Sequence, residues 1–345
     1  MIGQLSKYAF LNAKTRGMIS RLLSCDDFRT CAERADLDDL WNRVRRAHPP
    51  DPDVSVPTQP VRAQGIEKYV RVNERRQLQR LIQVIPTARE KEFLEVYCER
   101  YEIERLKRLI RAWHKKEPVP SDRGILQQQF RGVDVAVLLA SATIEEFILA
   151  LEKTPYRRPL NGAREKFKLH GSVFFLEIAL DIDYYRRVLD ALARLSFSDR
   201  KAVRKLLGVE IDMENIHWLI RFKKYYAAGV DDILGWIIPG GDKVRKEEVR
   251  RHYAGELTSL MESVHAGGYP ELKSFSPRNI HLVGQFLYAI LMREARRVMS
   301  GFPFTIGTLL AYCVMVRWEA KNCVSLAYAI QYGWDSEMTK AVLIC

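Results

Sequence analysis

Apolar residues recur along most of the chain at steps of three and four, which is the period of an amphipathic α-helix. The clearest run begins at Phe93 and would place apolar side chains on one face and charged side chains on the other. The apolar positions are Phe93, Leu94, Tyr97, Tyr101, Leu106, Leu109, Ile110 and Trp113, and the polar ones include Glu90, Lys91, Glu95, Glu99, Arg100 and Lys107. Period-two alternation, the pattern of strands, is nearly absent. The chain is therefore predicted to be all-α, with one long amphipathic helix here.

Helix boundaries are marked by capping residues and by proline. Thr143 and Thr87 are each followed three residues later by glutamate, which is the signature of a capping box at a helix start. Five prolines between His48 and Gln64 forbid a continuing helix in that segment. A second predicted linker is Glu117-Pro118-Val119-Pro120-Ser121. The chain should consist of many separate helices.

A block of sequence recurs along the chain. Residues 101–116 and 210–224 align without a gap at an offset of 110 residues, so that Glu102 matches Asp212 and Arg111 matches Arg221. A fainter copy begins at Glu319, with Asn322 in the place of Asn215, and another opens the chain at residues 12–16. A second repeated element, residues 22–28 and 138–147, consists of a helix end, a turn and a capped helix.

These repeats indicate an internal duplication with a period of about 110 residues. We predict three similar helical domains, 1–116, 117–230 and 231–345. The first would carry the Pro-rich insertion near 48–64.

One segment raises the question of a membrane span. Val298 to Val316 contains no charged side chain over 19 residues. Ser300, Gly301 and Pro303 interrupt its start, and the remaining 303–316 is shorter than a bilayer crossing. We predict a buried core helix. The first residues lack the charged start and apolar stretch of a secretory signal, so a cytoplasmic location is expected.

The net charge of the chain is compatible with several classes of binding partner. Lysine and arginine number 55 against 43 acids, a net charge of +12, which favours acidic partners. Nucleic acid, anionic lipid and an acidic protein surface all fit that sum. Six scattered cysteines contain no Cys-x-x-Cys pair, so free thiols and no metal site are expected.

Signatures of catalysis are missing from the sequence. There is no phosphate-binding Gly-x-x-x-x-Gly-Lys loop, no His-Glu-x-x-His and no Gly-x-Ser-x-Gly, and the histidines are single. Glu177, Asp181 and Asp183 would suit a carboxylate cluster that binds a cation, but with Arg186 and Arg187 beside them they are interpreted as a solvated helix face with local ion pairs. No catalytic residue, cofactor or metal is predicted.

Several segments, in order along the chain, resemble one known family. They are Tyr8 to Arg16 with Leu22-Leu23, Thr154-Pro155-Tyr156, Ile211 to Arg221, and Pro303 to Tyr312 followed by Glu319 and Asn322. The chain is similar to the C subunit of the archaeal and bacterial V-type ATPases and to the related d subunit of the vacuolar enzymes. Two departures are Arg157-Arg158 after the Thr-Pro-Tyr sequence and the absence of Thr-Pro-Tyr from the first repeat.

The resemblance implies a funnel of three helical domains around a pseudo-threefold axis. Such a funnel would sit as a socket on the proteolipid rotor ring, receive the central shaft (D/F-type subunits) and transmit torque for H⁺ or Na⁺ transport. It would be a non-catalytic, peripheral subunit at the cytoplasmic face of the membrane, without bound nucleotide or nucleic acid. Arg16, Arg111 and Arg221 would then occupy related places near the axis, with Tyr328 at the corresponding position of the third copy. These four are the predicted partner-contact residues.

Two other classes of protein remain as alternatives. Basic runs at 71–80 and 100–116 would suit a helical nucleic-acid-binding or adaptor protein, although both runs interleave acids with bases, as solvated ion-paired helices do. An enzyme without a recognisable signature would need a pocket of convergent titratable side chains with strongly shifted pKa values.

Overall fold

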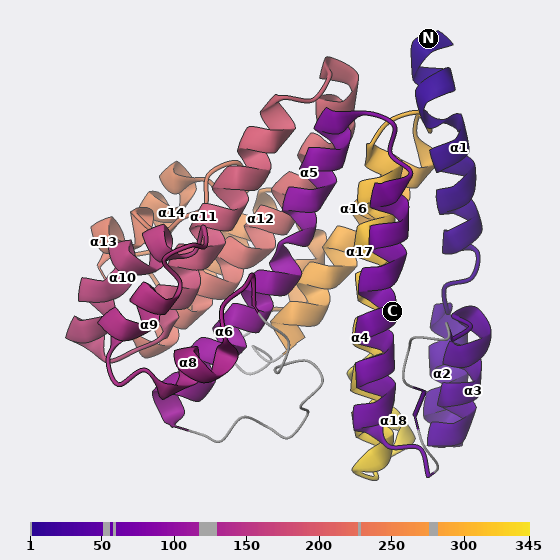
Figure 1. Cartoon of the computed structure of the whole chain (residues 1–345), viewed down its shortest axis with the longest axis horizontal. Helices are drawn as coiled ribbons and strands as arrows, with labels where there is room; N and C mark the ends of the chain where they lie inside the picture. Colours follow the sequence, from indigo (N-terminus) through magenta and orange to yellow (C-terminus); the bar gives the residue numbers. More distant parts are fainter. Residues whose placement is uncertain (1, 51–55, 58–59, 117–129, 227–228, 276–281) are drawn as a thin grey trace. The chain divides into compact units, whose positions relative to one another are not determined.

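The computed structural model describes residues 2–50, 56–57, 60–116, 130–226, 229–275 and 282–345 (Figure 1). The regular elements in these ranges are helices, and the only β-type pairing in them is an isolated bridge between Phe130 and Val133. The predicted all-α class is confirmed.

The chain divides into two compact units. Unit 1 comprises residues 1–91, 195–231 and 240–345, and unit 2 comprises 92–194 and 232–239. This division reflects which segments of the chain contact one another in space, and it does not test whether helices repeat along the sequence. The predicted repeat of about 110 residues concerns equivalent helices and stays a prediction, as do the three domains and the funnel.

Unit 1 is built around α17 (Gly307–Gln331), which packs against α4 (Ala63–Gln83), α16 (Val283–Ser300) and α1 (Ile2–Ile19). In Figure 1, α4 and α17 run side by side. The other elements are α2 (Cys25–Arg34), α3 (Leu37–Ala47), α12 (Phe197–Tyr225), α14 (Lys246–His252), α15 (Leu257–Ala266), the 3₁₀ helix η1 (Pro270–Ser274) and α18 (Ser336–Ala341). The helix α5 (Ala88–Cys98) begins in this unit and α13 (Val230–Leu234) crosses its boundary.

The apolar segment near residue 300 becomes the core of unit 1. α17 begins at Gly307, after Pro303, and nearly all its residues from Gly307 to Ala320 are buried. The predicted buried helix is therefore present, and it continues to Gln331. No helix in the described ranges is long and apolar enough to cross a membrane.

Unit 2 contains α6 (Arg100–Lys115), α8 (Val135–Ala140), α9 (Ile144–Ala150), α10 (Arg157–His170) and α11 (Phe174–Ala193). α10 packs on α11 after a turn at Gly171, whose φ of +62° suits glycine. The Trp113 ring of α6 lies 5.0 Å from Phe147 and 6.0 Å from Phe167, measured between centroids. An aromatic cluster therefore joins α6, α9 and α10.

Most predicted boundaries agree with the observed helices. Thr143 caps α9 by accepting the Glu146 N–H at 3.3 Å, while the Glu146 carboxylate accepts the Ala142 N–H. α5 begins at Ala88, directly after the predicted cap Thr87. Glu90, which the sequence pattern places on the polar face, is instead buried and forms an ion pair with Lys7. The predicted long helix is divided into α5 and α6, which are separated by Glu99.

The described residues of the Pro-rich segment up to Arg62 are non-helical, because α3 ends at Ala47 and α4 begins at Ala63. Its last two residues, Ala63 and Gln64, belong to α4. Residues 51–55 and 58–59 and the predicted linker at 117–121 lie outside the described residues. All six cysteines are free thiols, as predicted. Cys31 is buried, whereas Cys98 is only half-buried.

Candidate functional site

The four predicted partner-contact residues lie on three helices of unit 1 and one of unit 2. Arg16 is exposed on α1 and donates to the Met299 carbonyl at 2.9 Å. Arg221 is exposed on α12. Tyr328, half-buried on α17, donates to the Glu67 carboxylate at 2.9 Å. Arg111 lies on α6 of unit 2, with 46% of its side chain exposed. Their role in binding partners stays a prediction.

Three carboxylates at aligned sequence positions accept hydrogen bonds within their units. Asp212 and Glu319 are buried, whereas 40% of the Glu102 side chain is exposed. Glu102 matches Asp212 in the repeat, and the alignment of Asn322 with Asn215 puts Glu319 at the same place. Each of the three lies on a long helix, α6, α12 or α17. Each accepts hydrogen bonds from residues of its own unit.

In unit 2, Glu102 is bound by a phenol and a guanidinium. The buried Tyr156 hydroxyl donates to Glu102 at 2.8 Å, and Arg131 Nε donates at 2.6 Å. Thr154 Oγ1 accepts the Tyr156 N–H at 3.3 Å, which fixes the Thr-Pro-Tyr turn. Burial and the neighbouring Glu102 charge raise the pKa of Tyr156 well above its usual value, so the phenol remains a donor.

In unit 1, Asp212 has three donors. The N–H groups of Lys243 and Val244 donate at 2.6 and 3.0 Å, and the Tyr269 hydroxyl donates to the same carboxylate. Gly241 passes so close that a Cβ there would overlap the Asp212 carboxylate. Burial raises the pKa of Asp212 to about 6, and the three hydrogen bonds oppose that shift.

The side-chain partner of Glu319 in unit 1 is a histidine, whereas Glu102 and Asp212 each have a tyrosine. It accepts the Leu23 N–H at 2.7 Å and lies 2.7 Å from Nε2 of buried His48. Nδ1 of His48 is 2.8 Å from the Gln77 amide nitrogen, so this network assigns the proton to Nε2. His48 is a core histidine with a partner on each ring nitrogen.

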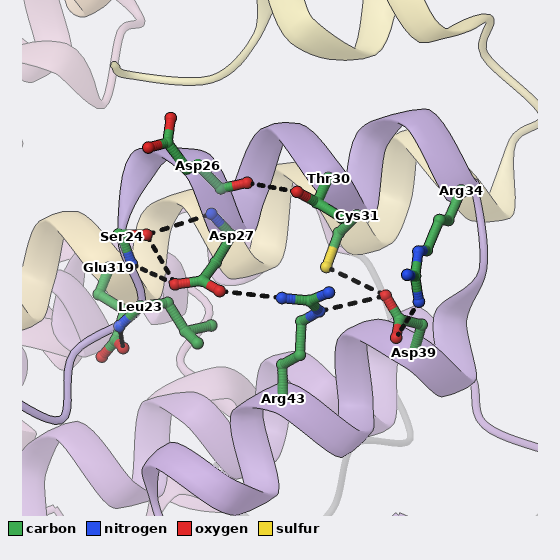
Figure 2. A network of polar contacts seen from close by, with 10 residues as sticks. All are labelled: Leu23, Ser24, Asp26, Asp27, Thr30, Cys31, Arg34, Asp39, Arg43 and Glu319. Carbon is green, nitrogen blue, oxygen red and sulfur yellow. Dashed lines mark hydrogen bonds and ion pairs between the residues drawn. The ribbon is translucent and has the colours of Figure 1, made fainter.

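The network around Leu23 continues through α2 and α3, as Figure 2 shows. Ser24 and Asp27 form a full capping box at the start of α2. Arg43 of α3 bridges Asp27 at 2.9 Å and Asp39 at 3.2 Å. Cys31 Sγ lies 3.6 Å from Asp39, and burial, the largest cause, raises the pKa of the Cys31 thiol to about 12. The thiol is therefore kept protonated and unreactive.

A second charged cluster joins α6 and α11 in unit 2. Lys107 Nζ lies 2.5 Å from Asp181, and Arg111 Nε lies 2.5 Å from Glu177. Lys107, Asp181 and Glu177 are buried. Burial raises the pKa of Asp181 to about 6, although Lys107 acts in the opposite direction.

This cluster corrects two predictions. The sequence pattern places Lys107 on a polar face, and Glu177 and Asp181 on a solvated one, yet all three are buried in ion pairs between helices. Only Asp183 keeps the predicted local pairing, with Arg187 Nε at 3.0 Å and Arg186 at 3.9 Å.

The environment of Arg221 is cationic. Burial, the largest cause, lowers the pKa of His217 to about 4, and the positive charges of Lys321 on α17 and Arg221 on α12 act in the same direction. Lys321 also lies over the Tyr288 ring, 4.2 Å from its centroid. This part of unit 1 therefore carries positive charge near Arg221 while His217 stays neutral at pH 7.

Several cations of the two basic runs that suggested nucleic acid make contacts within the chain. Arg71 lies 3.8 Å from Glu67, Lys107 is buried against Asp181, and Arg105 lies over the Phe130 ring. A groove that tracks phosphates needs solvent-facing cations, so these runs do not favour that alternative.

The arrangement of these hydrogen bonds and ion pairs ties helices together. Both oxygens of buried Asp212 and Glu319 have partners within unit 1, so neither acid is poised as a general base. Tyr156 and Arg131 both donate to Oε2 of the partly exposed Glu102. In the described ranges, no three His, Cys, Asp or Glu side chains converge to hold a metal ion. The sequence alone did not predict the hydrogen-bonded carboxylates at Glu102, Asp212 and Glu319, which we call the carboxylate clamps. One signal was present: Glu319 is a single acid within the mostly apolar α17, and a buried acid needs hydrogen-bond partners.

Comparison with known proteins gives a consistent result. A family model described as ATP synthase (C/AC39) subunit matches residues 11–342. The chain is 24% identical to the C subunit of the A-type ATP synthase of Archaeoglobus fulgidus, over 97% of this chain and 95% of the relative. The corresponding proteins of Methanosphaera stadtmanae and Methanothermobacter thermautotrophicus, which bear the same name, are 23% and 22% identical. Those two alignments cover 93% and 98% of this chain and 83% and 88% of the relatives.

Proposed function

We propose that this chain, which belongs to the ATP synthase (C/AC39) subunit family, connects the central shaft of a rotary ATPase to its membrane rotor ring. The observation that carries the proposal is the extent of the family match. It runs from residue 11 to residue 342 and so includes both units. The subunit would lie at the membrane periphery on the cytoplasmic side and transmit torque for H⁺ or Na⁺ transport.

The interior of each unit supports a mechanical role. Torque transmission needs helices that do not slide past one another, and buried hydrogen-bonded carboxylates fix the register between helices. Buried Asp212 and Glu319, together with the partly exposed Glu102, each tie a long helix to segments far away in the sequence. The saturated carboxylates of Asp212 and Glu319 also favour a non-catalytic subunit within the ATP-driven complex.

The charge of unit 1 supports contact with acidic partners. Unit 1 carries 37 basic and 26 acidic residues, whereas unit 2 carries 18 and 17. A net charge of +11 on one unit would attract acidic surfaces of the ring or the shaft and accelerate assembly at low salt.

The test is a pull-down of the purified chain with the detergent-solubilised rotor ring and the D/F-type shaft subunits, at low and high salt. We expect a complex in which one copy bridges the ring and one shaft, weakened by salt. Binding to neither component would overturn the proposal.

Variants test the predicted contact residues in the same pull-down. Arg221→Glu should lower the affinity for ring or shaft about tenfold or more, because a like charge would face an acidic partner. Arg158→Glu, at an exposed arginine of unit 2, makes the same change in net charge and should leave binding unchanged. Equal losses in the two variants would remove Arg221 from the contact.

A further inference from the structure

Cations and one aromatic ring share a single exposed face at the start of α12. Phe197 and Lys201, Arg204 and Lys205 are exposed, while Asp199, Val203 and Leu206 face the core. The helical period places the exposed set on one side of the first three turns. Within the described part of the chain, no acid forms an ion pair with Lys201 or Arg204.

The neighbouring helix α16 adds positive charge to this face. Buried Glu294 lies 3.2 Å from Lys205, 3.6 Å from Arg297 and 4.0 Å from Arg293, so one carboxylate is shared by three cations. Glu271 also pairs with Arg293. Two acids therefore balance five cations when Lys201 and Arg204 are included, which leaves a surplus of three positive charges.

A second exposed aromatic ring lies at the same end of the two helices. Phe302 follows α16 and is 53% exposed, and Phe197 is 75% exposed. The Ile306 N–H donates to Asp199 at 2.9 Å, which holds the connection between α16 and α17 against the first turn of α12. We call Phe197, Lys201, Arg204, Lys205, Arg297 and Phe302 the basic-aromatic surface.

We propose that the basic-aromatic surface binds the anionic phospholipid headgroups of a bilayer. Lysine and arginine near an anionic leaflet each strengthen binding about fivefold, and their effect falls off within a Debye length. Aromatic rings beside the cations enter the boundary between headgroups and acyl chains, where burial of apolar area adds affinity. An acidic protein would satisfy the cations, but the two exposed phenyl rings favour a lipid interface. The inference does not depend on the shaft-to-ring connection.

Flotation of the purified chain with lipid vesicles tests the proposal. The probes are vesicles of phosphatidylcholine alone and of phosphatidylcholine mixed with phosphatidylglycerol. We expect binding to the mixed vesicles, weakened by salt, and little binding to the neutral ones. Equal binding to both compositions, or to neither, would overturn the proposal. Capture by polyglutamate beads without flotation would also overturn it and point to an acidic protein partner.

Paired variants assign the binding to this surface. Lys201→Glu with Arg204→Glu should lower partitioning by more than about 25-fold. Lys153→Glu with Arg158→Glu, two exposed cations of unit 2, changes the net charge equally and should keep binding near that of the unmodified chain. Equal loss in the two pairs would show an effect of net charge alone and overturn the assignment.

A separate set of variants tests the two exposed phenyl rings. Phe197→Ser with Phe302→Ser should weaken binding roughly tenfold per ring. Leu169→Ser, at a side chain of unit 2 that is 76% exposed, should have no effect. Unchanged flotation of the double serine variant would contradict insertion of the rings. Thermal unfolding of each variant verifies that it is folded.

Discussion

A carboxylate is retained inside a protein when donors from the chain surround it, and Asp212 is the strongest case here. Its two oxygens receive two backbone N–H groups and the Tyr269 hydroxyl. The two peptides that donate, at Lys243 and Val244, reach it because the chain at Gly241 passes close to the carboxylate. The hydrogen bonds to Asp212 should therefore contribute to the stability of unit 1.

Gly241→Ala should destabilise unit 1 by about 2 kcal/mol or more, because the new Cβ displaces a carboxylate that three donors hold in place. Chemical denaturation measures the change in the free energy of unfolding. Gly17→Ala is the matched control. Nothing lies within 4 Å of its Cβ on α1, so this substitution should be neutral or stabilising. A neutral Gly241→Ala would mean that the clamp is loose.

The pH dependence of stability tests the charge state of Asp212. Its folded pKa of about 6 lies above the usual 3.8, so the folded state binds the proton more tightly than the unfolded state. The stability contribution is therefore fully present below about pH 4 and is lost as pH rises through 6. Relative to Asp212→Asn, the unmodified chain should lose stability between about pH 4 and about pH 6. A relative gain over that range would show that the three hydrogen bonds outweigh burial.

At the scale of residues, the sequence could indicate the aligned acids but not their donors. The repeat pairs Glu102 with Asp212, which is visible in the sequence. Tyr156, Tyr269 and His48 come from segments without a shared motif, and only the tertiary structure brings each donor to its acid. His48 supplies an imidazole where the other two clamps have a phenol.

Individual helices were predictable where an apolar stripe was long. The α5–α6 region follows its three-and-four pattern, and the uncharged segment ending at Val316 predicted the first half of α17. Thr143 caps α9 as predicted. The buried charges of α6 and α11 were not predictable, because Glu177 and Asp181 have arginines nearby in the sequence. Those arginines suggested local pairs, whereas Lys107 and Arg111 of another helix take the acids.

The α6–α11 contact yields a prediction at this scale. Lys107→Leu should cost about 3–5 kcal/mol of unfolding free energy, because it leaves Asp181 buried without its cation. Adding Asp181→Leu to that variant should recover much of the loss. Urea denaturation gives both values.

Arg186→Ala provides the control for that pair. Its side chain is 58% exposed and lies 3.9 Å from Asp183, so the expected change is within about 0.5 kcal/mol. If Lys107→Leu changed stability as little as Arg186→Ala, the ion pair would not be a determinant of the α6–α11 contact.

At the scale of the whole molecule, the positive charge and the predicted contact residues are unevenly distributed between the two units. Nearly all of the positive surplus belongs to unit 1, which also carries the basic-aromatic surface and three of the four predicted contact residues. We therefore expect unit 1 to dominate salt-sensitive assembly. The all-α class follows from the sequence pattern, whereas the division into two units joins segments separated by over 100 residues, which local periodicity does not encode.

The most direct test of the connector proposal is a cryo-electron microscopy structure of the intact rotary complex that contains this chain. The connector role predicts one copy between the rotor ring and the end of the central shaft, in contact with both. A copy bound only at the complex periphery, or absent from the rotor, would contradict that role.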